Sequence, residues 1–198
     1  MNKTAFPLNF TFKISTISND FIAKDANDQT FAYVKQKMFK FIEEISVYND
    51  ESQSEILYTI NANKWIDFSA SYIFKNSKDI EIGRVARKGW ASLWKARYEI
   101  FDLYQKQDLL IQEENGWVKV ADALMSEVPI LNLFTGYFFN PSYKVVRTDG
   151  TMVARLKKEK SFFGRNFSVT KLTDFINDEE ERMVLGLMMM ILLERRRG

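Results

Sequence analysis

The last eighteen residues, ERMVLGLMMMILLERRRG, place the strongest constraint on how this chain can fold. From Met183 to Leu193 the run has eleven residues without a polar side chain, and Glu194 and three arginines follow it. A transmembrane helix needs about 20 apolar residues, and a helix rises about 1.5 Å per residue. The run is therefore too short to cross a bilayer, and charged residues border it on both sides.

The apolar run is also not amphipathic, because its side chains cover every face of a helix. A helix that is apolar all round is buried all round. Asn177 and Glu180 fit a capping box at its start, and acidic residues in its first turn suit the positive end of the helix dipole. The sequence predicts a buried helix over about Asp178 to Arg195, with Gly186 facing a crowded wall because glycine in mid-helix is costly. A membrane-inserted helix is the alternative.

The rest of the chain is strand-like and contains a repeat of about thirty residues. It is rich in aromatic residues, with 17 Phe and 8 Tyr in the whole chain. The three copies read FIAKDANDQTFAYVKQKMFKFIEEISVYND, YIFKNSKDIEIGRVARKGWASLWKARYEIFD and KVVRTDGTMVARLKKEKSFFGRNFSVTKL. Internal self-similarity of this kind indicates a repeated supersecondary unit.

Each copy contains three strands with matching landmarks. The first strand ends in a basic residue, the second opens with a small residue and has an aliphatic residue two positions later, and a basic hairpin leads to the third. In chain order, the basic residues are Lys24, Lys75 and Arg147; the small ones are Ala32, Gly83 and Ala154; and the aliphatic ones are Val34, Val85 and Leu156.

These strands and three further candidates, NFTFKIS, EILYTINA and DLLIQEEN, give about twelve. A sheet of that size tends to curl or close, and a closed barrel of twelve strands is too wide to be filled by side chains alone. We therefore expect a mainly β protein: a single domain over residues 1–198, in which a closed barrel surrounds the C-terminal helix. We also expect a short amphipathic helix from Trp117 to Val128, ended by Pro129, and a buried strand over Ile130 to Phe139, although that apolar run could instead dip into a bilayer.

The segments FIAKDANDQTFAYVKQK, IGRVARKGW and GYFFNPSYKVVRTDGTMVARL resemble the tubby C-terminal-like superfamily, in its LURP-one-related and phospholipid-scramblase-like branch. The resemblance covers about Phe10 to Leu193 and implies a barrel of about twelve strands around a hydrophobic C-terminal helix. Tubby proteins bind phosphoinositides, and scramblases are associated with membranes and calcium. The cysteine-rich, lipid-modified segment of scramblases is absent here, and no phosphoinositide-binding residue of tubby is carried over.

Composition excludes several functional classes. The chain has no Cys and no His, which removes Cys and His zinc sites, Cys nucleophiles and His bases. With 28 basic and 26 acidic residues, the net charge of +2 gives no reason to expect nucleic-acid binding. The start, MNKTAFPLNFTFKIS, lacks the apolar core of a signal peptide. We expect a cytoplasmic protein, peripheral to a membrane if it binds lipid, without cofactor or metal.

The candidate binding residues are the cations of the three basic hairpins. If these hairpins lie together, they form a surface for lipid phosphates, with each cation contributing about 1 kcal/mol near an anionic membrane. The alternative is that they only guard strand edges against pairing. The candidates are Lys35, Lys37, Lys40, Arg84, Arg87, Lys88, Lys157, Lys158, Lys160 and Arg165.

Other sites have weaker support. The segment DANDQ, Asp25 to Gln29, lacks the glycine and the closing glutamate of a calcium loop and is expected to be a turn. Glu43–Glu44 and Glu113–Glu114 are adjacent pairs, whose members point to opposite faces of a strand. The sequence thus favours a non-catalytic module that binds anionic phospholipid. A structural or protein-interaction domain using the barrel rim or SEVPILNLF, and a carboxylate-based enzyme, are the alternatives.

Overall fold

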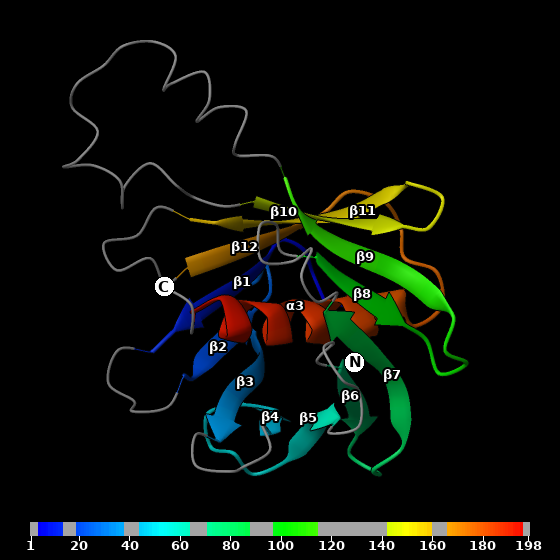
Figure 1. The fold of residues 1–198 in the computed structure, drawn as a ribbon. Helices are drawn as coiled ribbons and strands as arrows, with labels where there is room; N and C mark the ends of the chain where they lie inside the picture. The colour runs from blue at the N-terminus through cyan, green and yellow to red at the C-terminus, as the bar shows by residue number, and fades with distance from the viewer. Residues whose placement is uncertain are drawn as a thin grey trace, which may run out of the picture.

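A closed antiparallel barrel of twelve strands surrounds a single long helix, α3 (Figure 1). The computed structural model describes residues 4–13, 19–37, 44–63, 71–87, 97–114, 142–159 and 166–195. The strands are β1 (Leu8–Phe12), β2 (Phe21–Lys24), β3 (Thr30–Lys37), β4 (Glu44–Tyr48), β5 (Ile56–Asn63), β6 (Ser71–Asn76), β7 (Glu81–Arg87), β8 (Arg97–Phe101), β9 (Gln107–Glu113), β10 (Ser142–Arg147), β11 (Met152–Lys158) and β12 (Asn166–Lys171), and the helix is α3 (Glu179–Arg195). The predicted fold class is confirmed.

Each strand pairs with its neighbours in the sequence, and β1 closes the barrel by pairing with β12. Because all the pairs are antiparallel, the odd-numbered strands all end at the same end of the barrel. Five short connections lie at the opposite end, over residues 25–29, 49–55, 77–80, 102–106 and 148–151. Helix α3 begins at the end with these short turns, since Glu179 contacts the last residue of β10 there. We call this the helix-start end, and the other the helix-finish end.

The barrel interior is filled by α3. From Met183 to Leu192 its side chains are at most 1% exposed on every face. The inward residues of the strands meet them, as the alternating burial of Leu8, Phe10 and Phe12 in β1 illustrates. The prediction of a buried helix is confirmed, and its observed start lies one residue after the predicted one.

Gly186 lies against the wall of the barrel, as predicted. A Cβ atom built on it would lie 2.7 Å from Cδ1 of Ile100 and 3.5 Å from Cδ1 of Ile111. Carbon atoms do not approach so closely without a shift of the neighbour, and Ile100 is fully buried. The glycine therefore permits close contact between α3 and strands β8 and β9.

The small residues of the repeat are structurally equivalent, as predicted. Ala32, Gly83 and Ala154 are each paired with a residue of the preceding strand, directly beside a register shift near the hairpin turn. With β5, β9 and β1 added, the three copies form three groups of four strands. The barrel thus has an approximate threefold repeat in its order of strands.

One detail of the predicted repeat is wrong. Lys24 and Lys75 pair immediately beyond the register shift, but in the third copy that position belongs to Val146. Arg147 instead opens the turn, with its backbone N–H donating to Thr151 O at 2.9 Å. Aligning the three copies on their basic residues therefore shifts the first strand of the third copy by one position.

The predicted cap of α3 is also corrected. Asn177 has a left-handed φ of 51°, and the first helical bond runs from Arg182 N to Asp178 O, 3.2 Å. Asp178 therefore occupies the capping position, and Glu180 accepts a hydrogen bond from the Thr4 hydroxyl at 2.6 Å instead of closing a capping box. The acidic first turn of α3 connects the helix to the barrel wall.

Two predicted elements, the helix over 117–128 and the strand over 130–139, lie outside the described residues. In the part of the chain that is described, none of the helices has the length and apolar character needed to cross a membrane.

Candidate functional site

The three strands that carry the predicted basic residues end together. β3, β7 and β11 are odd-numbered strands of an antiparallel barrel, so Lys37, Arg87 and Lys158 all lie at the helix-finish end. The sequence alone did not establish this convergence, because it depends on an even number of strands between the copies.

The described candidates divide between the two faces of the wall. Lys158 follows the alternation of buried Leu156 and lies on the inner face of β11, while Lys157 is exposed on the outer face. Arg87 is also on the inner face, where its guanidinium carbon lies 6.0 Å from the ring centre of buried Tyr98. The period of two in a strand explains the division.

Two other candidates are engaged along the outer wall. Lys35 donates to Gln53 Oε1 at 3.2 Å, and Arg84 donates to Glu81 Oε1 at 2.9 Å. Lys40, Lys88, Lys160, Arg165 and the side chain of Lys37 lie outside the described residues. The structure therefore brings Arg87, Lys157 and Lys158 to the helix-finish end, but leaves Lys35 and Arg84 bound to neighbours on the wall.

The chain segments that join strand ends at the helix-finish end have a distinctive composition. Segments 13–20, 38–43, 64–70, 88–96, 114–141 and 159–165, with 196–198 after α3, contain ten Lys or Arg and seven Asp or Glu. They also contain all four Trp residues of the chain: Trp65, Trp90, Trp94 and Trp117. Sequence reasoning missed this signal, since it is the strand order that shows which connections belong to the same end.

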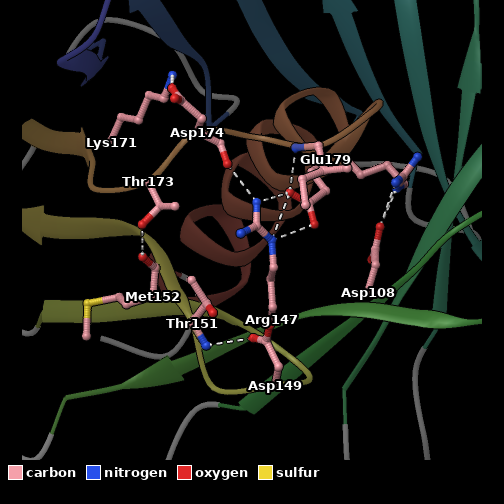
Figure 2. Close-up of polar contacts among 11 residues, drawn as sticks. Asp108, Arg147, Asp149, Thr151, Met152, Lys171, Thr173, Asp174 and Glu179 are labelled. Carbon is pink, nitrogen blue, oxygen red and sulfur yellow. Dashed lines mark hydrogen bonds and ion pairs between the residues drawn. The ribbon is translucent and has the colours of Figure 1, made fainter.

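A cluster of buried ion pairs lies at the opposite end, around the first turn of α3 (Figure 2). Arg147 donates Nε to Glu179 Oε1 at 3.0 Å and Nη2 to Glu179 Oε2 at 2.7 Å. It also donates to the backbone oxygen of Asp174 at 2.7 Å, while Ile176 N donates to Glu179 Oε2 at 2.9 Å. Arg147 thus joins the end of β10 both to the first turn of α3 and to the connection between β12 and α3.

A second pair joins α3 to β9. Arg182 contacts Asp108 Oδ2 through Nη2 at 2.6 Å and through Nε at 2.8 Å. Its aliphatic stem crosses Gly83, where an added Cβ would lie 2.6 Å from Arg182 Cδ and 2.6 Å from Phe101 O. Gly83 also has φ +152°, a conformation that side-chain-bearing residues rarely adopt. The glycine thus lets Arg182 reach Asp108.

The surroundings shift the pKa values of these groups in different directions. Burial opposes ionisation of Glu179, but hydrogen bonds from Arg147 and from Ile176 N lower its pKa overall. Burial raises the pKa of Asp108 despite the attraction of Arg182. The hydrogen bond to Glu179 raises the pKa of Arg147. Glu179 is therefore held ionised between two cations, while the charge of Asp108 is costly.

This cluster is suited to anchoring the helix. The carboxylate of Glu179 is bound on both oxygens, and Glu180 and Glu181 accept from Thr4 and the Tyr58 hydroxyl. Among the described residues, no group of three or more acidic side chains is arranged to hold a metal ion. The cluster provides neither a base beside a nucleophile nor a metal centre, and it fixes α3 to strands β5, β9 and β10 and to Thr4, which precedes β1.

The remaining sequence candidates have structural explanations. Asp25 Oδ1 accepts from the backbone N–H groups of Asn27 and Gln29 at 2.9 and 3.0 Å, so DANDQ is a turn, as predicted. Glu114 pairs with Arg155 at 3.0 Å, whereas Glu113 lies on the inner-face alternation of Leu109 and Ile111. Glu43 lies outside the described residues, so the expectation that Glu43 and Glu44 point to opposite faces stays a prediction.

Comparison with known proteins agrees with the architecture. A family model described as LURP-one-related matches residues 29–191, which include most of the barrel and most of α3. The resemblance noted in the sequence is thereby confirmed. A search of curated proteins finds no match.

Proposed function

The chain belongs to the LURP-one-related family, within the tubby C-terminal-like superfamily, and from this premise we propose that it is a non-catalytic module that binds anionic phospholipid. The contact surface is the helix-finish end. The protein is then peripheral to the membrane, with the barrel outside the bilayer. No nucleic acid and no cofactor take part.

The single observation that carries this proposal is the composition of the helix-finish end. Arg87, Lys157 and Lys158 lie at this end, and the sequence that joins strands there includes all four tryptophans of the chain. Basic residues are attracted to anionic lipid, each by about 1 kcal/mol, and tryptophan favours the interface between headgroups and acyl chains. The combination of cations with tryptophans favours a membrane-binding surface over strand edges that cations only protect from pairing.

Two further candidates compete. A protein-interaction domain would use the barrel rim or the segment SEVPILNLF, which lies outside the described residues. A carboxylate-based enzyme needs two acidic groups that converge on a substrate. The described part of the chain favours neither: its most deeply buried carboxylate at α3, Glu179, is bound on both oxygens by Arg147.

Co-sedimentation with vesicles of phosphatidylcholine, with and without phosphatidylserine or a phosphoinositide, tests the proposal. We expect binding only with anionic lipid and weakening by salt, since the Debye length is about 8 Å at physiological ionic strength. The triple variant Lys157→Ala, Lys158→Ala, Lys160→Ala should bind roughly 100-fold more weakly, from about 1 kcal/mol per cation.

A matched control removes the same charge from the opposite end. Lys75→Ala, Lys78→Ala, Lys106→Ala changes the net charge equally, yet its residues lie at the helix-start end. We expect nearly unchanged vesicle binding. Equal weakening by both triple variants would mean that bulk charge, and not a surface at the helix-finish end, drives association. Wild-type protein that ignores anionic vesicles at low salt would refute the proposal outright.

A further inference from the structure

Exposed apolar side chains in the described part of the chain concentrate at the helix-start end. Tyr104 is 85% exposed, and five other large hydrophobic residues are between 42% and 55% exposed. All six lie in or directly beside the connections at that end: Ile56, Ile80, Leu103, Tyr104, Leu172 and Ile176. Single exposed apolar residues are ordinary, but Leu103 and Tyr104 are adjacent at one turn tip, and Tyr104 is the most exposed of the six.

Folding does not require this arrangement, as equivalent turns in the same barrel demonstrate. The turns at 25–29, 77–80, 102–106 and 148–151 share one pattern of backbone hydrogen bonds and a residue with positive φ at the same position. At their tips they carry Ala26–Asn27, Ser77–Lys78, Leu103–Tyr104 and Thr148–Asp149. Three tips have at least one polar residue that solvates the turn. The fourth places a leucine and a tyrosine in water.

The apolar side chains stand within a strongly acidic surface. The five turns and the crossover over 172–178 contain ten Asp or Glu and two Lys. Four of the ten acidic residues form ion pairs with lysines outside these segments: Lys24–Asp28, Lys75–Asp79, Lys171–Asp174 and Lys13–Glu51. Asp25, Asp50 and Asp102 instead accept hydrogen bonds from backbone N–H groups of their own turns.

We infer that the helix-start end docks a protein partner, through a cationic segment that also carries aliphatic or aromatic side chains. The apolar tips supply contact area, with Leu103 and Tyr104 at the centre of three consecutive hairpins. The acidic groups around them attract Lys and Arg and disfavour acidic partners. Tyrosine is among the side chains that contribute most to protein interfaces.

The same charge argues against two other occupants. An anionic membrane is repelled by this surface, because six acidic residues face two lysines even when the four ion pairs are set aside. A second copy of this chain could offer its basic end, but that contact is head-to-tail and produces open filaments unless it closes a ring. A separate protein with a basic, apolar segment satisfies both the charge and the hydrophobic surface.

Selection of random twelve-residue peptides displayed on phage, using the full chain as target, tests the inference. Binding peptides should be enriched in Lys and Arg together with Leu, Phe or Trp. Their affinity, measured by fluorescence anisotropy on synthetic peptides, should fall at least tenfold for Leu103→Ser, Tyr104→Ser. A matched variant at the other end, Lys157→Ser, should leave the affinity unchanged. Thermal melting verifies that both variants are folded.

Each outcome decides the inference. Peptides without a cationic bias, or peptides that bind Leu103→Ser, Tyr104→Ser as well as the wild type, would overturn it. So would loss of vesicle binding in that variant, which would make this end the membrane contact. Self-association in sedimentation velocity that both variants abolish would identify a second copy as the occupant. Failure of the vesicle experiment above leaves this inference intact, because it concerns the opposite end.

Discussion

The two ends of the barrel are built from the same strands but differ in chemistry. At the helix-start end the turns are short, each uses backbone hydrogen bonds in a repeated pattern, and acidic residues outnumber basic ones by ten to two. At the helix-finish end the joining segments are mostly longer, and they hold all four tryptophans and an excess of cations.

The two ends also differ in how the described residues hold the helix. Buried ion pairs at the helix-start end fix α3, as Arg147–Glu179 and Arg182–Asp108 show. Binding residues are commonly placed on connections that a rigid scaffold supports, and the anchored helix provides such a scaffold for the connections at both ends.

The largest expected effect follows from removing the element that both ends share. A chain that ends at Asp178 lacks α3 and leaves the barrel without its core. Each large buried side chain lost costs about 2 to 5 kcal/mol, against a total stability of about 5 to 15 kcal/mol. We expect no cooperative unfolding transition by circular dichroism. A soluble truncation that melts cooperatively would show that the wall folds without the helix.

A smaller but still large effect is expected from Gly83→Ala. The repeat suggests tolerance, since Ala32 and Ala154 occupy the equivalent positions. The structure predicts the opposite, because the added Cβ meets both a backbone oxygen and the stem of Arg182, with a cost of about 2 to 4 kcal/mol.

The matched control for this substitution is Gly150→Ala. Gly150 has φ +89° but no atom within 4 Å of an added Cβ, so only backbone strain of about 1 kcal/mol is expected. Urea unfolding measures both. Equal destabilisation of the two variants would mean that the Arg182 contact contributes nothing at the helix-start end.

The smallest expected effect is a change in the acid sensitivity of the helix-start end. The folded state holds the pKa of Glu179 below its usual value of 4.5, so the unfolded chain takes up this proton first as the pH falls. The resulting stability is present above about pH 4.5 and is lost as the pH falls through the folded pKa. Glu179→Gln should therefore lose less stability between pH 5 and 3.

Urea unfolding at several pH values between 5 and 3 gives the slope of stability against pH for the wild type and for Glu179→Gln. Burial raises the pKa of Asp108, so its carboxyl affects the pH dependence of stability in the opposite direction to Glu179. Its contribution favours folding at low pH. Asp108→Asn should accordingly steepen the acid loss. The same slope in Glu179→Gln as in the wild type would contradict the assignment of Arg147 and Ile176 N as the groups that hold Glu179 ionised.

Much of the fold could be predicted from sequence because it depends on local patterns. The apolar run of α3 required burial, and the alternation within each repeat defined strands. The ion pairs Arg147–Glu179 and Arg182–Asp108 could not be predicted, since their partners are 32 and 74 residues apart. To predict that Arg87 and Lys158 lie on the inner face of the wall and Lys157 on the outer face, the register of each strand is needed. To predict which connections share an end, the closed order of strands is needed.

Tryptophan fluorescence on vesicles tests most directly the claim that the helix-finish end is the membrane surface. All four tryptophans lie in segments that join strands there. Vesicles containing phosphatidylserine should shift the emission to shorter wavelength, and headgroup-attached spin labels should quench it, while phosphatidylcholine alone leaves it unchanged. Binding that leaves the emission unshifted and unquenched, and that Leu103→Ser, Tyr104→Ser abolishes, would contradict the account by placing the membrane at the helix-start end.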